Sequence, residues 1–208
     1  IIFKEENLAK LASCGVGFLD AANEIVPIAL HYKGLDPNSQ KREDYPQAQA
    51  AMAKIRPFIS YFNSSRYGMD LANGDVCIAV GWSGGVALAK RLADAAGKGV
   101  NVAMALPKEG APMWSDVMMI PTNAPHTQEA HAFINYIMRA DVIARISNKI
   151  GYPNPNKEAT ALVNPEVRDN PAMYIPDDAR KTLFALEPMP AAIERIRTRT
   201  WTAIKTNR

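Results

Sequence analysis

The chain has 208 residues, of which 48% are hydrophobic and 22% are charged. This composition is typical of a globular protein and excludes a disordered, collagen-like or acidic solvating chain. The 24 lysines and arginines against 21 aspartates and glutamates leave a net charge of only +3. A nucleic-acid-binding or membrane-surface protein usually carries a broader basic excess, so neither nucleic acid nor a membrane is an expected partner.

Hydrophobic periodicity and turn residues predict alternating helices and strands along the first half of the chain. The expected helices cover residues 6–13, 20–33, 45–56, 64–72, 84–96, 127–139, 141–150 and 191–205. The expected strands cover residues 16–19, 59–63, 75–82, 100–106 and 113–121. This alternation indicates an α/β layer structure with a partly parallel sheet. Asp20 is the expected N-cap of the second helix, and the proline-rich stretch 152–190 is expected to wrap around the molecule as short helices and loops.

One glycine-rich turn, Gly81-Trp82-Ser83-Gly84-Gly85, lies between an expected buried strand and a helix. Its glycines permit a sharp turn and let backbone N–H groups face a ligand at a helix N-terminus. The turn lacks the spacing of a phosphate loop or a dinucleotide-binding loop. It does match the Gly-x-Ser-x-Gly turn of α/β-hydrolases. A serine hydrolase using Ser83, with Asp116 and then His126 or His131, is therefore an alternative function.

A second group of candidate residues combines aromatic rings with an acid. Trp82 lies in the turn, Trp114 and Asp116 lie in the expected strand 113–121, and Tyr152 follows a helix stop. Residues two apart on a strand share a face, so Trp114 and Asp116 are expected side by side. An indole beside a carboxylate suits an organic cation, because the ring face and the anion both attract positive charge. The alternative is that both tryptophans are core residues.

The two cysteines, Cys14 and Cys77, are too far apart for a redox or zinc motif. They are either two buried thiols or, in an oxidising compartment, one disulfide across a long loop. The sequence contains no cluster of histidine, cysteine and acidic residues with metal-ligand spacing, and no cofactor is expected.

Several stretches resemble the polyamine-binding proteins of bacterial ABC transporters, and most of all the putrescine-binding member. They are Leu71-Ala72-Asn73-Gly74-Asp75 continuing to Trp82, Val100-Asn101-Val102 continuing to Ala111, Arg197-Thr198-Arg199-Thr200-Trp201, Asp36-Pro37-Asn38-Ser39 and Asn164-Pro165-Glu166-Val167-Arg168. The resemblance covers essentially the whole chain in collinear order.

The resemblance implies a periplasmic receptor of the two-lobed type II class that holds a polyamine between its lobes and delivers it to a membrane permease. It implies ligand contacts from Trp82, Trp114, Asp116 and Tyr152, and it favours a disulfide between the two cysteines. It places residues 1–108 in the C-terminal lobe, 109–155 in the N-terminal lobe and 156–208 back in the C-terminal lobe. Most of the N-terminal lobe is then missing, and we expect a complementary fragment or a further N-terminal part of the protein to supply it.

Two positions depart from the putrescine-binding pattern, which has an aspartate where Gly85 stands and a glutamate where Asn23 stands. Both are acids that pair with an ammonium group in the family. Losing such a partner typically costs about 2–5 kcal/mol, so the usual pose of putrescine is expected to change. Glu24 is adjacent, but it is not expected to compensate unless the local helix turns.

Overall fold

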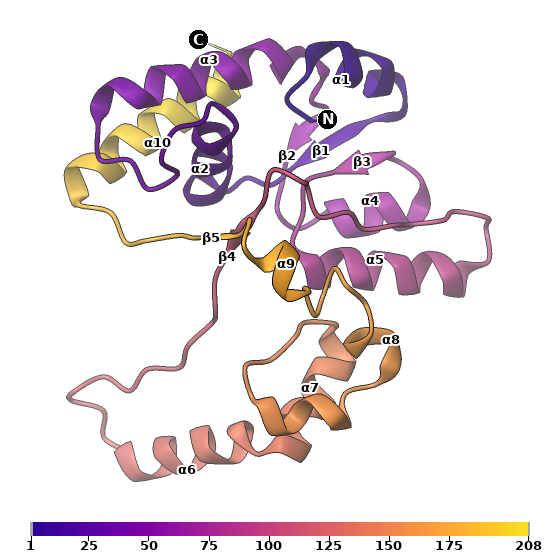
Figure 1. Ribbon diagram of the computed structural model, residues 1–208, viewed down its shortest axis with the longest axis vertical. Helices are drawn as coiled ribbons and strands as arrows, with labels where there is room; N and C mark the ends of the chain where they lie inside the picture. The colour runs from indigo at the N-terminus through magenta and orange to yellow at the C-terminus, as the bar shows by residue number, and fades with distance from the viewer. Residues whose placement is uncertain (1, 208) are drawn as a thin grey trace.

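The computed structural model describes residues 2–207 and confirms the α/β architecture (Figure 1). The chain has ten α-helices within these residues, and short 3-10 turns adjoin several of them. The helices are α1 (Glu5–Leu11), α2 (Ala22–Tyr32), α3 (Tyr45–Ile55), α4 (Tyr67–Asn73), α5 (Ser83–Ala96), α6 (Thr127–Met138), α7 (Ala140–Ile150), α8 (Pro165–Arg168), α9 (Asp177–Arg180) and α10 (Ala191–Thr206). The strands are β1 (Val16–Phe18), β2 (Tyr61–Phe62), β3 (Ile78–Ala79), β4 (Pro112–Met113) and β5 (Phe184–Ala185).

The larger sheet has the order β2-β1-β3, and both of its strand pairs are parallel. The central strand β1 is fully buried, with Gly17 in register with Tyr61 on one side and Ala79 on the other. Because the strands are parallel, their carboxyl ends lie at the same edge of the sheet. The chain leaves that edge three times, into α2, α4 and α5, and this edge is where ligands bind in open α/β folds.

The main hydrophobic core joins the sheet to the helices that cover it. Phe18 of β1, Ile25 and Leu30 of α2, Met52 of α3 and Ile204 of α10 are among its most buried members. Helix α10 packs on α2 and α3, so the C-terminal end of the chain closes this body (Figure 1). Burying each such side chain contributes roughly 1.5–3 kcal/mol, which makes this core the main source of stability.

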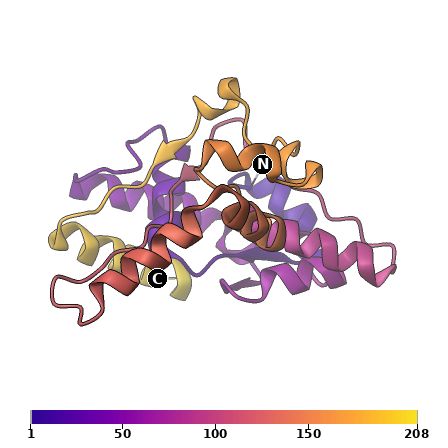
Figure 2. The same ribbon diagram turned by 90° about the horizontal axis from the view of Figure 1, so that it is seen from below.

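A second, much smaller core lies in the part of the chain that contains α7 and α8. Its buried members are Ala144, Ala159, Val163 and Val167. The paired strands β4 and β5 lie where the chain passes from the larger body to this smaller one and returns (Figure 1). Helix α6 contains no buried residue, and it lies at the surface nearest the viewer when the molecule is seen from below (Figure 2).

Three of the expected strands are wrong in length or absent. The segment 75–82 pairs only at Ile78–Ala79, 113–121 pairs only at its start, and 100–106 forms no strand. A strand persists only where a neighbour satisfies its backbone N–H and C=O groups. Within the described residues, β3 is a sheet edge, and the chain runs unpaired from β4 towards α6 (Figure 1). The same lack of a second neighbour leaves β3 half-buried rather than buried on both faces.

The helix boundaries follow the sequence closely, with one correction. Gly74, Gly97 and Gly151 end α4, α5 and α7 in left-handed conformations that a residue without a Cβ adopts at little cost. Asp20, however, is not the N-cap of α2, because Ala21 occupies that position. The Asp20 carboxylate is bonded to α10 instead.

Cys14 and Cys77 form a disulfide with their Cα atoms 5.5 Å apart. This confirms the disulfide that the family resemblance implies and excludes the two free thiols. Cys14 lies two residues before β1 and Cys77 directly before β3, so the bond fixes two neighbouring strands at the end opposite the three functional loops. Within residues 2–207, no helix combines the length and the apolar character that crossing a membrane requires.

Candidate functional site

Three loops at the carboxyl edge of the larger sheet bring an acid and two aromatic residues together. Glu24 lies in the first turn of α2, after β1, and Tyr67 begins α4, after β2. Trp82 is the N-cap of α5, after β3. Each of these residues is distant from the others in sequence, and the parallel order of the strands alone places them at one edge.

The Trp82 side chain is held by a carboxylate. Its indole Nε1 donates a hydrogen bond of 2.7 Å to Glu24 Oε2. The Trp82 backbone N–H donates to the Tyr67 hydroxyl at 3.2 Å, and that hydroxyl donates back to the Trp82 carbonyl at 3.4 Å. The rings of Tyr67 and Trp82 meet edge to face with their centroids 6.3 Å apart. The indole is therefore oriented by its hydrogen bond to Glu24 and by its ring contact with Tyr67, and the Trp82 backbone is held by the Tyr67 hydroxyl.

The glycines of the turn make room for two tyrosines. A Cβ atom at Gly81 or Gly85 would overlap Tyr67, and a Cβ atom at Gly84 would overlap the ring of Tyr152. None of these glycines has a positive φ. The turn therefore needs glycine for close approach of aromatic rings and not for an unusual backbone conformation.

Tyr152 completes the cluster from the start of the segment that follows α7. Burial raises the pKa of its hydroxyl, a hydrogen bond with the Gly85 backbone opposes that shift, and the nearby carboxylates of Asp116 and Glu24 raise the pKa further. Burial, with Tyr152 and Glu24 nearby, also raises the pKa of Tyr67 to about 12. Both tyrosines are neutral at pH 7 and act as hydrogen-bonding groups.

Glu24 is the carboxylate of this cluster. Burial raises the pKa of its side chain, and the hydrogen bond from Trp82 partly opposes this shift. A half-buried carboxylate with one strong donor keeps further lone pairs free to accept hydrogen bonds. The arrangement of an indole face, a carboxylate and two hydroxyls suits a small organic cation. We name these five residues, Glu24, Tyr67, Trp82, Gly85 and Tyr152, the indole–carboxylate site.

The structure brings together some of the residues expected from the sequence and leaves others apart. Trp82, Gly85 and Tyr152 belong to the indole–carboxylate site. Trp114 is 45% exposed, and Asp116 is also exposed, on the unpaired stretch beyond β4. That stretch is not a paired strand, so the strand geometry from which a shared face of Trp114 and Asp116 was predicted does not form. Asp116 is near enough to Tyr152 to influence its pKa.

Sequence reasoning missed two members of the site. Asn23 is exposed, and its neighbour Glu24 is the residue whose side chain reaches Trp82. No turn of the helix beyond its regular geometry is needed. The available signal was an acid in the first turn of a helix that follows a buried strand, the same kind of position that Trp82 occupies. Tyr67 gave a weaker signal, because an aromatic residue at a helix start is more often part of a core.

The hydrolase alternative is not supported. Ser83 begins α5, whereas His126 and His131 are exposed residues at the start of α6 and within it. Figure 1 shows α6 well apart from α5. Among the described residues, neither histidine is hydrogen-bonded to Ser83 or to Asp116, so the relay that a Ser-His-Asp mechanism requires is not assembled.

The parallel sheet with functional loops at its carboxyl edge is the fold of the family that the comparisons identify. The model of the family described as bacterial extracellular solute-binding protein matches residues 5–175, and the chain belongs to that family. It is 48% identical over 206 residues to a putrescine/agmatine-binding protein of Pseudomonas aeruginosa, covering 99% of this chain and 56% of that protein. It is 49% identical to the putrescine-binding periplasmic protein PotF of Escherichia coli, covering 100% of this chain and 56% of that protein.

Solved structures support the same fold. A putative spermidine/putrescine ABC transporter protein from Listeria monocytogenes superposes with a TM-score of 0.84 at 21% identity, covering 99% of this chain and 62% of that one. The substrate-binding protein PotD of Streptococcus pneumoniae superposes with a TM-score of 0.79 at 23% identity, covering 97% and 61%. The chain thus spans about half the length of the curated relatives it matches. These relatives are named as binding proteins and not as enzymes.

Proposed function

We propose that this chain is part of a periplasmic receptor that binds a polyamine or a related organic cation and delivers it to the permease of an ABC transporter. The observation that carries the proposal is the hydrogen bond of 2.7 Å between Trp82 Nε1 and Glu24 Oε2. It places a half-buried carboxylate at the edge of an indole ring at the ligand-binding edge of the sheet. The names of the relatives in P. aeruginosa and E. coli support putrescine as the first ligand to test.

In this proposal an ammonium group lies against the face of Trp82 and forms an ion pair with Glu24. Contact between a cation and an indole contributes roughly 0.5–2 kcal/mol, and more as water is excluded. The hydroxyls of Tyr67 and Tyr152 accept hydrogen bonds from the same ammonium group or from the second ammonium group of a diamine. Gly85 carries no acid, so the charge that the family pattern expects at this position is supplied by Glu24.

The remaining expected contacts belong to a closed form of the receptor. We propose that residues 1–108 and 156–208 form the C-terminal lobe, that 109–155 belong to the N-terminal lobe, and that a polypeptide outside this chain completes that second lobe. Trp114 and Asp116, which lie on the exposed stretch after β4, would then face the ligand from the second lobe's side of the site. Closure of the lobes would exclude water and present the permease with a distinct shape. The ligand contact expected of Asn23 stays a prediction, since Asn23 is not a member of the indole–carboxylate site.

Calorimetric titration of the receptor with its second lobe present tests the proposal. We expect saturable binding of putrescine, agmatine or spermidine, and a strong loss of binding in Trp82→Phe together with Glu24→Gln. A neutral diol of the same length as putrescine is the matched control and should not bind. Absence of binding to every amine, or equal binding of the diol, would reject an organic-cation receptor.

A further inference from the structure

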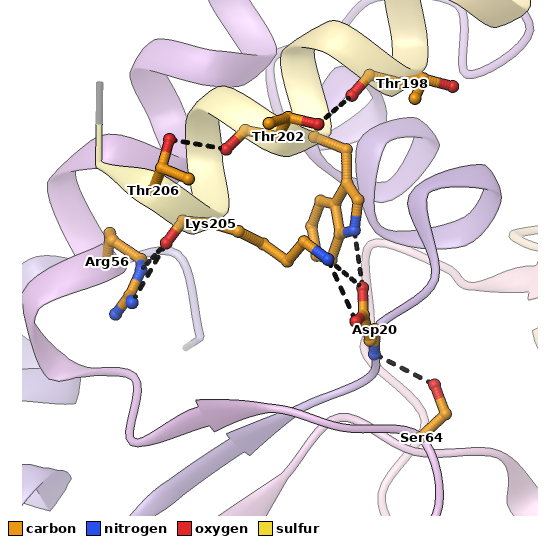
Figure 3. A network of polar contacts seen from close by, with 8 residues as sticks. Asp20, Arg56, Ser64, Thr198, Thr202, Lys205 and Thr206 are labelled. Atoms are coloured by element: carbon orange, nitrogen blue, oxygen red, sulfur yellow. Dashed lines mark hydrogen bonds and ion pairs between the residues drawn. The ribbon is translucent and has the colours of Figure 1, made fainter.

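Asp20 lies in the connection between β1 and α2 that leads directly into the turn carrying Glu24. Its carboxylate accepts hydrogen bonds from Trp201 Nε1 at 2.8 Å and from Lys205 Nζ at 2.9 and 3.1 Å (Figure 3). Burial by itself would raise the pKa of Asp20, but the bonds from Lys205 and Trp201 outweigh it and lower that pKa. The side chain is therefore an anion at neutral pH, held by two residues of α10.

The two donors on α10 are themselves fixed. The Lys205 carbonyl accepts hydrogen bonds from Arg56 Nε at 3.4 Å and Nη2 at 3.3 Å (Figure 3). The Trp201 ring meets Phe62 of β2 edge to face at 5.0 Å and is buried. Helix α10 is thus anchored to the end of α3 and to the sheet, and it provides a rigid support for Asp20.

A further bond links this connection to the loop that carries Tyr67. The Asp20 backbone N–H donates to Ser64 Oγ at 3.0 Å (Figure 3). Ser64 lies between β2 and α4, shortly before Tyr67. Asp20 thus contacts both the segment that leads to Glu24 and the loop that leads to Tyr67, although it makes no hydrogen bond with either of these two residues.

We propose that Asp20 is a positioning residue, which through its bonds to Trp201 and Lys205 holds the start of α2 so that Glu24 meets the Trp82 indole. Asp20 does not cap α2, whose N-cap Ala21 makes no side-chain cap bond. The first turn of α2 has no capping side chain of its own, and the bonds of Asp20 hold the segment that enters it. Because Glu24 is the proposed ligand carboxylate, the inference rests on the proposed function.

Amine titrations of three variants test the inference. Asp20→Asn keeps an acceptor for Trp201 but loses the ion pair with Lys205, and it should weaken amine binding about 10-fold, as when support behind a binding group is removed. Lys205→Met removes the same ion pair without touching the loop and should act in the same direction. Asp94→Asn is the matched control, because it breaks the exposed pair of 3.0 Å between Lys90 and Asp94 on α5. It should change binding less than about 2-fold.

A double-mutant cycle separates positioning from a general loss of stability. In a Glu24→Gln background, Asp20→Asn should change the remaining affinity less than about 2-fold, because its effect passes through Glu24. An unchanged 10-fold loss in that background, or no loss in the wild-type background, would overturn the inference.

A second readout needs no ligand. The indole N–H resonance of Trp82, assigned with Trp82→Phe, reports the bond to Glu24, and its acid titration reports the Glu24 carboxyl. Tyr67 and Tyr152, which also face Glu24, do not titrate in the acid range. Asp20→Asn should move this resonance towards its position in Glu24→Gln and lower its titration midpoint, as Glu24 becomes more exposed. An unmoved resonance contradicts the inference even if amines bind, whereas a moved resonance in a receptor that binds no amine rejects only the proposed function.

Discussion

At the scale of single residues, the site depends on which of two neighbouring side chains points towards Trp82. Asn23 and Glu24 are adjacent in sequence, but a helix rotates successive side chains by about 100°, so only one of them can face the indole. The structure gives that position to Glu24. The charge balance of the site therefore differs from the one that the two departures from the family pattern suggested.

Glu24→Gln should reduce the affinity for putrescine about 30-fold, since a partly desolvated ion pair is worth about 2 kcal/mol at the lower end of its usual range. The wild-type affinity should fall as the pH drops through the raised pKa of Glu24, because only the ionised carboxyl attracts an ammonium. This loss of affinity at low pH should be much smaller in Glu24→Gln. Titration calorimetry between about pH 4 and pH 8 measures both effects.

Asn23→Glu is the matched control for that experiment, since it adds an acid to an exposed position beside Glu24. We expect less than about a 3-fold change in putrescine affinity, as for other exposed charges. A gain from Asn23→Glu that equals the loss from Glu24→Gln would contradict the assignment of the carboxylate.

Gly85→Ala should destabilise the protein by about 1–3 kcal/mol, because its Cβ overlaps the hydroxyl of the buried Tyr67. Gly68→Ala is the control, because a Cβ there meets only the Gly85 carbonyl at 3.4 Å. It should be neutral or stabilise the helix by up to about 1 kcal/mol. Urea unfolding measures the difference, and Tyr67→Phe should partly rescue Gly85→Ala by removing the overlapping oxygen. Equal stability of the two alanine variants would show that Tyr67 moves aside freely.

The overlap between a Cβ atom at position 85 and Tyr67 also limits what an acid at this position could do. Gly85→Asp introduces a carboxylate only by displacing Tyr67, which also holds the backbone of Trp82 through two hydrogen bonds. Restoring the acid alone is therefore expected to disturb the indole that it should assist.

At the scale of elements, three short strands carry the functional loops, and covalent and polar links hold these strands in register. The two-residue strands β2 and β3 offer few backbone hydrogen bonds of their own. The disulfide between Cys14 and Cys77 fixes β1 against β3 at one end, and the contacts of Asp20 with α10 fix the other. These links add to the stability that the sheet gains from the hydrophobic core around β1.

Replacing both cysteines by serine should lower the free energy of unfolding by about 4 kcal/mol, as loop-closure entropy predicts for a sequence separation of 63 residues. Urea unfolding of Cys14→Ser/Cys77→Ser against the oxidised wild type measures this loss. The reduced wild type is the control and should match the variant. A difference below about 1 kcal/mol would mean that the strands hold their register without the disulfide.

At the scale of the whole molecule, the two hydrophobic cores are very unequal. The smaller one contains four buried residues, and it leaves α6 with none. Large apolar side chains are exposed on α6 and on the stretch before it: Trp114, Val117, Met118, Met119, Phe133, Tyr136 and Met138. Large apolar side chains exposed in this number are typical of a surface that further polypeptide covers. These exposed side chains support the proposal that polypeptide outside these 208 residues completes this lobe.

Phe133→Ser together with Met138→Ser should therefore reduce self-association of the isolated chain, because both side chains are more than half exposed. Analytical ultracentrifugation over a range of protein concentrations measures the effect. Leu88→Ser with Leu92→Ser, on the outer face of α5, is the matched control and should change association little. If the control pair abolishes self-association and the α6 pair does not, the surface responsible for self-association lies on α5.

The sequence by itself determined the helices, the parallel α/β class and the turn that carries Trp82. Helices and glycine stops are set by local periodicity and backbone sterics, so their ends were predicted to within a few residues. Trp82 and Tyr152 drew attention as aromatic residues beside a turn and a helix stop, whereas Gly85 was singled out as a ligand position only by the family resemblance, and their ligand contacts stay predictions.

Only the tertiary structure decided the lengths of the strands and the identity of the carboxylate. Strands depend on neighbours far away in the sequence, and here β3 and the stretch after β4 lack a second neighbour within the described residues. Asp20 has the sequence of a helix cap, yet Trp201 and Lys205, at the other end of the chain, offer its carboxylate stronger donors. Glu24 likewise acquires its role from Trp82, which a different strand brings within 2.7 Å. Such choices depend on which groups meet in space, and local sequence carries no record of them.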